Sequence, residues 1–235
     1  MIKSNVIEKL MKFQLTRPEA TVYLCLLENG PLTGYEVSKL TGISRSNVYG
    51  SLNVLVDKGG AMLEEGGNTT HFAAVSPDEF MEGHLRSLEK ERQYLLSHIG
   101  RRLSDQEGYL TVRGAVNITN KAIHMIDACG LRLYLMASAD IVEELVPALK
   151  RAWERGLKIV IISDRSWQEI STACYKDCTE GGQIRLITDS SYVLTGELTG
   201  RDSDTCLYSG QENLVNVMKE ALRNKIRLLE TEKDL

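Results

Sequence analysis

The chain has 235 residues, of which 43% are hydrophobic and 26% charged, and its formal net charge is −4 at pH 7. This length and apolar content suffice to bury a core in one or two domains. The acidic balance excludes a polycation that coats nucleic acid, and no uncharged apolar run approaches the ~20 residues of a membrane helix. The opening stretch MIKSNVIEKLMKF mixes acids and bases, which argues against a signal peptide. We therefore expect a cytoplasmic protein that stays out of the membrane.

The cysteine content also points to a reducing compartment, because an odd number of thiols cannot form a complete disulfide framework. Cys174 and Cys178 lie four positions apart, whereas metal sites usually use tighter pairs with further ligands nearby. We therefore expect neither a metal nor another cofactor. A thiol or metal sensor built on Cys174 and Cys178 remains an alternative. The five cysteines are Cys25, Cys129, Cys174, Cys178 and Cys206.

Three helix starts share the capping-box pattern, in which a hydroxyl residue is followed three positions later by glutamate. They are Thr16 to Glu19, Thr33 to Glu36 and Ser76 to Glu79. The first two predict helices over 19–28 and 34–40. Gly42 supplies a tight turn, and a third helix follows from a cap at Ser44 to the glycine pair 59–60. Two helices joined by a short turn that contains glycine indicate a helix-turn-helix.

The third helix has one apolar side and one polar side. Val48, Leu52 and Leu55 recur at helical spacing and predict the buried side. Arginine can donate two hydrogen bonds to guanine, asparagine can pair in the same way with adenine, and hydroxyls suit phosphates. The alternative is that Ser44 only caps the helix and Arg45 only keeps it soluble. The candidate DNA-binding residues here are Ser44, Arg45, Ser46, Asn47, Tyr49 and Ser51.

Two short strand-like runs follow the third helix, AMLEE and THFAAV, on either side of a glycine-rich turn. They predict a β-hairpin, which completes a winged helix-turn-helix DNA-binding domain over residues 1–79. Glu64 and Glu65 would repel phosphates from this wing. Any wing contacts to DNA are therefore expected from Asn68, Thr69, Thr70 and His71.

The stretch FQLTRPEATVYLCLLENGPLTGYEVSKLTGISRSNVYGSLNVLVDKGG resembles the N-terminal domain of the TrmB-family transcriptional regulators. The resemblance implies a winged helix that binds a double-stranded DNA operator. The chain departs from the family pattern after the third helix, where KGGAM replaces an apolar pair. The matching positions are Leu15, Thr16, Glu19, Ala20, Tyr23, Glu36, Val37, Ser38, Ile43, Arg45, Ser46, Val48, Tyr49, Leu52 and Leu55.

A long helix is predicted over residues 80–104, with apolar positions that alternate in steps of four and three. This a/d pattern is typical of a coiled coil, so we expect a homodimer seam. A dimer would present two reading helices to half-sites about 34 Å apart. The alternative is that the helix packs on its own domain. SDQEGY then forms a linker. The seam positions are Met81, Leu85, Leu88, Arg92, Leu95 and Ile99.

From residue 109 to 235 helices alternate with strands, which predicts an α/β sheet domain with right-handed crossovers. We expect helices at 114–129, 139–156 and 211–235, and strands at 131–138, 157–164, 183–189, 192–198 and 204–209. The chain is thus predicted to be a multidomain α+β and α/β protein. This part resembles half of a phospholipase D fold. The H-x-K pair that such an enzyme needs follows none of the four histidines, so no catalytic residues and no enzymatic activity are expected.

Ligands of open α/β sheets bind beyond the carboxyl ends of the strands. Polar residues there could hydrogen-bond a sugar or another polyol, or hold a cation, and the family resemblance implies that sugars are possible. Ordinary polar loop ends are the alternative. We expect a transcriptional regulator whose operator affinity a ligand controls, or alternatively a protein-interaction module that has lost DNA binding. The candidate ligand residues are Ser138, Asp164, Arg165, Thr188, Asp189 and Glu197.

Overall fold

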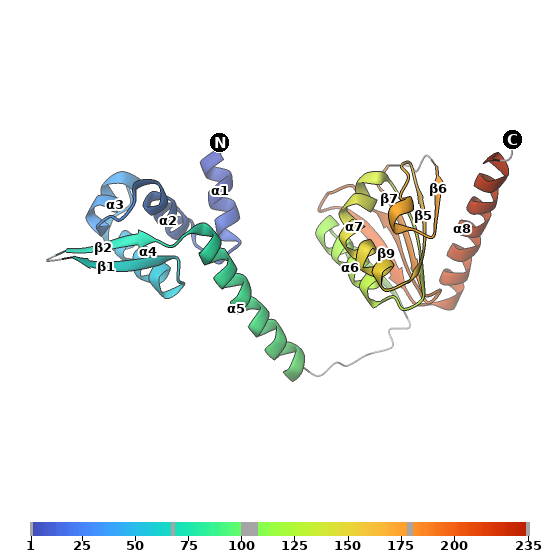
Figure 1. Ribbon diagram of the computed structural model, residues 1–235, viewed down its shortest axis with the longest axis horizontal. Coiled ribbons are helices and arrows are strands. Elements are labelled where there is room, and N and C mark those ends of the chain that lie inside the picture. The colour runs from blue at the N-terminus through green and yellow to red at the C-terminus, as the bar shows by residue number, and fades with distance from the viewer. Residues whose placement is uncertain (1, 67–68, 100–107, 178–180, 234–235) are drawn as a thin grey trace. The chain divides into compact units, whose positions relative to one another are not determined.

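The computed structural model describes residues 2–66, 69–99, 108–177 and 181–233. They belong to two compact units, Met1–Arg102 and Leu103–Leu235, each of which is described by itself (Figure 1). Of the SDQEGY linker expected at 104–109, residues 104–107 lie outside the described residues, and Tyr109 begins a strand.

The N-terminal unit is the predicted winged helix-turn-helix, with one helix that the sequence pattern did not reveal. That helix, α1, is short and contributes Leu10 to the core, where 3% of its surface is exposed. The elements are α1 (Ile2–Met11), α2 (Arg17–Asn29), α3 (Gly34–Thr41), α4 (Arg45–Asp57), β1 (Ala61–Gly66), β2 (Thr69–Ala74) and α5 (Pro77–His98).

Two of the three expected capping boxes are complete. The side chains of Thr16 and Thr33 each accept a hydrogen bond from the backbone of the glutamate three residues later, and that glutamate reaches back to the cap. At Ser76 only half of the capping box is present among the described residues. The Glu79 N–H donates to Ser76 Oγ at 3.3 Å, but the Glu79 side chain does not accept from the Ser76 backbone. Glu19 is also buried beside Lys58, whose Nζ lies 2.7 Å from Glu19 Oε2.

The core of the N-terminal unit forms around α4, as the apolar spacing predicted. Val48, Leu52 and Leu55 are fully buried, together with Tyr23 of α2. The Tyr23 hydroxyl donates a 2.9 Å hydrogen bond to the Val75 carbonyl, and burial raises the pKa of this phenol. This buried bond ties α2 to the end of the hairpin.

The hairpin and the start of α5 close the same core. β1 and β2 pair antiparallel, and an isolated bridge from Leu32 to Phe72 adds a third short segment beside β2. Phe80, in the first turn of α5, is buried, and its ring centroid lies 5.4 Å from that of Tyr23. The wing and the base of α5 are therefore held by one cluster of apolar side chains.

The C-terminal unit contains a seven-stranded sheet in the order β3-β9-β8-β7-β4-β5-β6 among the described residues. Strands β3 and β6 were not expected from the sequence. The elements are β3 (Tyr109–Arg113), α6 (Ala115–Ala128), β4 (Arg132–Ala137), α7 (Ala139–Glu154), β5 (Lys158–Ser163), η1 (Gln168–Ile170), β6 (Ala173–Lys176), β7 (Gln183–Thr188), β8 (Tyr192–Glu197), β9 (Thr205–Ser209) and α8 (Glu212–Lys233).

The sheet that the described strands form is mixed. Only β4, β5 and β6 run parallel to one another. β7 lies antiparallel to β4, and β8, β9 and β3 continue the antiparallel half. Crossover helices join parallel strands, but β7 to β9 are joined by short turns, which require antiparallel pairing. The carboxyl end of β7 therefore lies at the opposite edge from those of β4 and β5.

Helices cover both faces of the sheet (Figure 1). α6 and α7 pack on one face, where Ile118, Leu145 and Leu149 are fully buried. α8 crosses the other face, and the apolar stripe predicted for it contacts Ile162, Ile187 and Val193. The three-layer arrangement thus follows from two apolar sheet faces that both need cover.

A single carboxylate organises the turn that leads into β4. Asp189, at the end of β7, accepts hydrogen bonds from the backbone N–H groups of Gly130, Leu131 and Arg132 at 2.8–3.0 Å. Its own backbone adopts a φ of 51°. Burial alone would raise the pKa of Asp189, but these backbone donors prevail and lower it.

We predict that Glu19→Gln lowers the free energy of unfolding by about 1–2 kcal/mol at pH 7, because it weakens a helix cap and removes the partner of Lys58. Hydrogen bonds from Lys58 and Thr16 outweigh burial and lower the pKa of Glu19. The carboxylate therefore stabilises the fold above its unfolded pKa, and the difference from wild type should shrink as the pH falls through the folded value. Urea unfolding from pH 7 to 3 measures this. Glu36→Gln, in the exposed capping box, is the matched control and should cost less; equal losses would contradict the role of Lys58.

We predict that Asp189→Asn destabilises the full chain by roughly 2 kcal/mol, because an amide cannot accept three backbone hydrogen bonds as well as a carboxylate can. The lowered pKa means that this stabilisation is present near neutral pH and is lost in acid. Thermal unfolding at several pH values reports it. Asp202→Asn, at an exposed loop position, should leave the melting temperature unchanged. An Asp189→Asn protein as stable as wild type at pH 7 would refute the assignment.

Candidate nucleic-acid interface

The turn between α3 and α4 sets the direction of α4. Gly42 ends α3 with a φ of 72°, a left-handed conformation that favours glycine. The Ser38 hydroxyl donates a 2.7 Å hydrogen bond to the Ile43 carbonyl across the turn. Ser44 caps α4 by accepting from the Asn47 N–H at 3.5 Å. The capping role expected for Ser44 is thus present, and it uses the hydroxyl of that residue.

The exposed side of α4 differs in part from the side expected. Ser44, Arg45, Ser46, Asn47 and Tyr49 are exposed. Ser51 is not: only 7% of its surface is accessible. At helical spacing Ser51 follows Val48 and precedes Leu55, so it lies on the buried side and cannot reach DNA, which corrects its assignment.

Three neighbouring residues belong to the exposed side and were missed. Gly50 and Asn53 follow Ser46 in steps of four and three, so they share one line along the helix. Both are exposed, and a methyl group placed on Gly50 would meet no atom within 4 Å. The third residue is Tyr35 of α3, which contacts Arg45. The helical periodicity alone could have identified Gly50 and Asn53, whereas the position of Tyr35 requires the fold.

Two aromatic contacts orient the polar side chains at the start of α4. The Arg45 guanidinium carbon lies 4.4 Å from the centroid of the Tyr35 ring, which is a cation–π geometry. The Tyr49 ring covers Gly34 so closely that a Cβ there would lie 2.6 Å from it. Arg45 and Tyr49 therefore each contact a residue of α3 while both remain exposed.

The wing offers hydroxyls and few charges. Thr69 and Thr70 are exposed and His71 is half-buried, whereas Asn68 lies outside the described residues. Glu64 is exposed and pairs in register with His71. On α3, hydrogen bonds from Thr33 lower the pKa of Glu36, and the charge of the wing residue His71 adds to this effect. The carboxylates around the wing make it a weak surface for phosphates.

The expected seam of α5 leaves the core after its first turns. Met81 is half-buried, and the other five seam positions are exposed. The exposed fractions of Leu85, Leu88, Leu95 and Ile99 lie between 44% and 64%. Arg92, the polar seam position, is paired within its own helix, where Nε and Nη2 donate to Glu89 at 2.7 and 2.8 Å. These bonds hold the pKa of Glu89 at about 2.

The six candidate ligand residues of the C-terminal unit do not form one site. Thr188 and Asp189 lie at the far edge of the sheet because β7 is antiparallel to β4. Thr188 is buried, with 4% of its surface exposed, and Asp189 is occupied by backbone donors. Their assignment as ligand residues is therefore wrong. The expectation grouped the carboxyl ends of all the strands at one edge of the sheet, whereas the carboxyl end of β7 lies at the other.

The remaining four lie near the carboxyl ends of β4 and β5, but most of their polar groups are engaged. Asp164 Oδ1 accepts a 2.7 Å hydrogen bond from the Ala139 N–H at the start of α7, which lowers the pKa of this carboxyl. Arg165 lies 3.6 Å from Glu143 and stacks on Trp167. Glu197 pairs in register with Gln183 at the end of β8. Ser138 lines a cavity.

That cavity has a volume of about 660 Å³ and lies between the starts of α6 and α7 and the turns around residues 181 and 199. Its polar groups are hydroxyls, one amide and two carboxylates: Thr119, Asn120, Ser138, Asp140, Glu144 and Thr199. Thr119 Oγ1 donates to Glu144 Oε2 at 3.3 Å. Such a lining can hydrogen-bond a neutral polar molecule.

Three of the four cysteines in the described part of the chain, Cys25, Cys129 and Cys206, are buried. No group of three or more His, Cys, Asp or Glu residues there could hold a metal ion. Burial raises the pKa of the Cys206 thiol to about 12. Cys174 Sγ accepts from the Trp167 N–H at 3.3 Å, and Cys178 lies outside the described residues.

Among the described residues, no helix is both long enough and apolar enough to span a membrane.

One family model and several known proteins are similar to this chain. Residues 10–78 match the family model described as sugar-specific transcriptional regulator TrmB. The protein YrhO of Bacillus subtilis, described as uncharacterized, is 27% identical over 217 residues, which cover 91% of this chain and 74% of YrhO. The HTH-type sugar sensing transcriptional regulator TrmBL1 of Pyrococcus furiosus is 29% identical over 178 residues, which cover 71% of this chain but only 49% of TrmBL1.

Two solved structures resemble the chain at low identity. One is TrmBL2, described as an archaeal chromatin protein, with 20% identity, 97% of this chain and 99% of TrmBL2 covered, and a TM-score of 0.47. The other is the phospholipase D family member Nuc from Salmonella typhimurium, with 16% identity, 51% and 95% covered, and a TM-score of 0.38. The stretch that matches the TrmB family model, residues 10–78, coincides with the winged helix described above.

Proposed function

We propose that this chain is a homodimeric, sequence-specific regulator that reads an operator with α4, and whose operator affinity changes when a ligand binds the C-terminal unit. The observation that carries the proposal is the exposed polar side of α4. Ser46, Gly50 and Asn53 lie along it without any covering side chain from their own unit. Arginine and asparagine near the start of such a helix are the residue types that read base edges in the major groove.

Gly50 supports a close approach to DNA. A glycine inside an exposed helix costs roughly 0.5–1 kcal/mol relative to alanine, and nothing around Gly50 requires the loss of a side chain. Because Gly50 has no side chain, the middle of the exposed polar side of α4 can come closer to the floor of the DNA major groove. Structural reasons alone would favour alanine at this position.

The charge distribution indicates that the wing contributes little to affinity. The exposed Glu64 repels phosphates, and Thr69 and Thr70 offer hydroxyls only. Phosphate contacts are then expected from α3, α4 and their flanks, where Lys39 and Arg45 are exposed. Binding should therefore fall with rising salt, but less steeply than for a protein with a basic wing.

Dimerisation through α5 would cover the apolar row of Leu85, Leu88, Leu95 and Ile99, which the N-terminal unit leaves in solvent. An a/d row of this kind packs against the same row of a second helix. The pairing of Arg92 with Glu89 leaves the arginine able to lie at the edge of the seam while it remains neutralised. Two copies would then present two α4 helices to half-sites about 34 Å apart, or a multiple of that distance.

A sugar or another polyol is the ligand class that the 660 Å³ cavity fits, because its lining is rich in hydroxyls and it contains Ser138. The description of the matched family as sugar-specific supports this choice. A ligand can change operator affinity only if it prefers one of two arrangements of the dimer. No catalytic step is part of this proposal.

The acidic surface favours one other function, a protein-interaction module that no longer binds DNA. The observations behind it are the net charge of −4 and the exposed Glu64 on the wing. Salt dependence separates the two functions, because counterion release makes DNA binding strengthen steeply as salt is lowered. If the chain binds no DNA even at the lowest salt concentration, the interaction module is the correct function.

We predict that Gly50→Ala weakens binding to DNA about tenfold, although it raises thermal stability, because the added methyl group holds α4 away from the groove. Fluorescence anisotropy with labelled promoter DNA measures the affinity, and thermal unfolding measures the stability. Gly83→Ala, in α5, is the matched control: it also adds a methyl to a helical glycine and should leave DNA affinity unchanged. Equal affinities for Gly50→Ala and wild type would show that α4 does not approach DNA closely.

We predict that Leu88→Glu converts the dimer to a monomer, with a dissociation constant raised at least about 100-fold, because a carboxylate replaces an apolar seam contact. Sedimentation equilibrium over a range of concentrations measures this. Lys90→Gln lowers the charge by the same single unit on the opposite side of α5 and should leave the dimer intact. A wild-type chain that is monomeric would contradict the proposed dimer, and a Leu88→Glu chain that still dimerises would place the interface elsewhere.

A further inference from the structure

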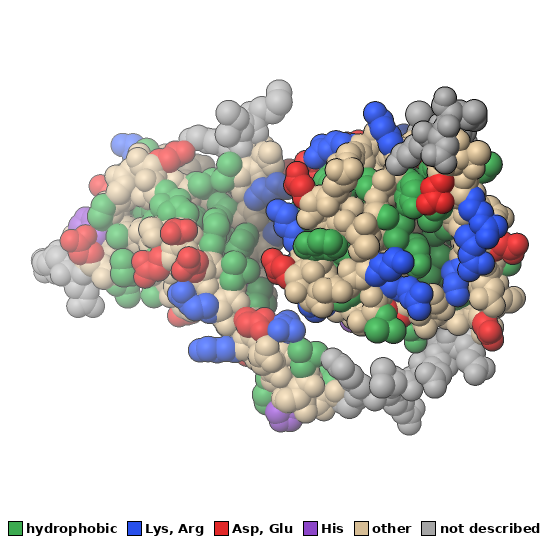
Figure 2. All heavy atoms as spheres, turned by 45° about the vertical axis from the view of Figure 1, so that its right-hand side comes forward, with side chains coloured by type: hydrophobic (Ala, Val, Ile, Leu, Met, Phe, Trp, Pro, Cys, Tyr) green, Lys and Arg blue, Asp and Glu red, His purple; other side chains and the backbone are tan. Residues whose placement is uncertain are grey.

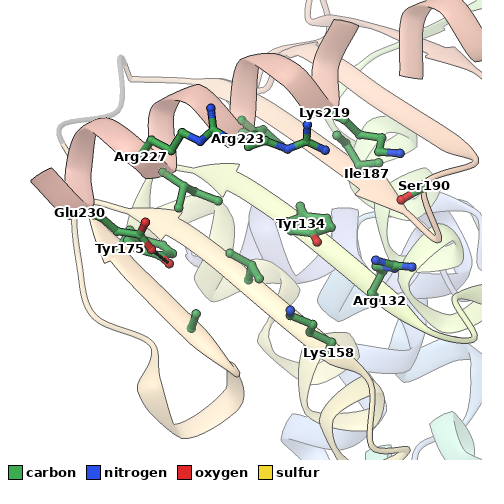
Figure 3. A pocket seen from close by; sticks show the side chains of 14 residues that line it. Arg132, Tyr134, Lys158, Tyr175, Ile187, Ser190, Lys219, Arg223, Arg227 and Glu230 are labelled. Atoms are coloured by element: carbon green, nitrogen blue, oxygen red, sulfur yellow. Dashed lines mark hydrogen bonds between the residues drawn. The ribbon is translucent and has the colours of Figure 1, made fainter. Parts of the chain in front are cut away.

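A second cavity of the C-terminal unit lies between α8 and the sheet face that α8 crosses, with a volume of about 530 Å³. It differs from the 660 Å³ cavity in position and in charge. Five cationic side chains line it, and Figure 3 shows three of them along α8 and the other two on the strand starts below: Arg132, Lys158, Lys219, Arg223 and Arg227. Figure 2 shows Lys and Arg side chains around an apolar patch on one face of this unit.

The fold brings these cations together from three elements. Lys219, Arg223 and Arg227 follow one another at four-residue steps, so they project from one side of α8. Arg132 and Lys158 begin the neighbouring parallel strands β4 and β5 and are paired in register. Tyr134, Val160 and Ile187 lie between them and form an apolar floor.

The charges of these five side chains are not neutralised within the part of the chain that the structure describes. None of them has a side-chain hydrogen bond or an ion pair there, whereas Lys225 of the same helix pairs with Asp177 at 2.8 Å. Like charges at four-residue steps on a helix are destabilising. A concentrated cationic cavity in a protein of net charge −4 is therefore a local feature that stability does not explain.

The one carboxylate in the lining does not compensate for them. Glu230 lies at one end of the cavity, where its Oε1 accepts a 2.7 Å hydrogen bond from the Tyr175 hydroxyl. This bond, together with burial, raises the pKa of Tyr175. Glu230 is thus held against β6, and Arg132, Lys158 and Lys219 remain available to a bound anion.

We propose that this cavity binds a small organic anion that carries phosphate groups, a phosphate ester or a pyrophosphate. Guanidinium groups donate paired hydrogen bonds to phosphate oxygens, and ammonium groups add point charges. The volume falls within the range of pockets for small molecules, and Tyr134 and Ile187 provide an apolar surface for the organic part. The site shares no residue with the exposed polar side of α4, so a test of this site is separate from a test of the proposed DNA binding.

Titration calorimetry on the full chain tests the site. Inorganic pyrophosphate is the minimal probe, and glucose 6-phosphate is compared with glucose, which lacks the phosphate group. The ionic strength is kept constant at about 0.1 M, because exposed charges are screened by salt. We expect pyrophosphate and glucose 6-phosphate to bind and glucose not to bind at this cavity. Binding of pyrophosphate alone would restrict the ligand to free phosphates.

The double variant Lys219→Gln with Arg223→Gln removes two cations without removing apolar surface. It should bind pyrophosphate at least about tenfold more weakly, and without ligand it should be no less stable than wild type, because a repulsion is relieved. Lys150→Gln with Arg201→Gln removes two exposed cations elsewhere in the same unit and should bind like wild type. This pair separates a built site from the effect of net charge.

Two results would overturn the proposal. One is a wild-type chain to which neither millimolar pyrophosphate nor glucose 6-phosphate binds. The other is equal loss of binding in the two double variants, which would mean a diffuse charge effect. If the Lys219 and Arg223 variant lost affinity for DNA while no small anion bound to wild type, the cations would belong to a nucleic-acid surface instead.

Discussion

Burial of one side of α4 against α2 is the constraint on which the N-terminal unit depends. Val48, Leu52 and Leu55 must all leave water together, because their spacing places them on the same side of the helix. Once that side faces Tyr23, the other side has to face solvent, and its residues are thereby selected for whatever the unit binds. The glycine turn at residue 42 and the cap at Ser44 set only where the helix begins. The residues that stabilise the unit and the residues that we propose to contact DNA thus lie on opposite sides of one helix.

In the C-terminal unit the direction of the strands has the corresponding importance. Because β4 and β5 are parallel while β7 is antiparallel to β4, each edge of the sheet mixes strand starts with strand ends. The hydroxyl-lined cavity lies at the edge where β4 ends, and the cationic cavity lies near the edge where β4 and β5 begin. The same mixed order gives Asp189 its structural task, since it places this carboxylate beside the backbone that enters β4. One sheet therefore offers two chemically different cavities.

Much of the fold could be predicted from the sequence, and the misses have physical reasons. The apolar spacing of α4 and α8 and the threonine caps of α2 and α3 are local signals, and they were read correctly. β3 and β6 were missed because they are short edge strands in which no residue is fully buried. Strand direction is not a local property, so Thr188 and Asp189 were placed at the wrong edge. Ser51 is different: helical spacing already put it on the buried side. The gathering of Arg132 and Lys158 with three cations of α8 depends on strand order and could not be predicted.

The central claim is that side chains at the start of α4 distinguish bases in a DNA duplex. Selection of bound duplexes from a random pool by the full chain tests it most directly, with a parallel selection by Arg45→Ala. The account predicts that the wild-type chain enriches a defined sequence with two related half-sites and that Arg45→Ala relaxes the preference at one base pair in each half-site. A wild-type pool that stays random after repeated rounds at low salt, or an identical preference for both chains, would contradict it.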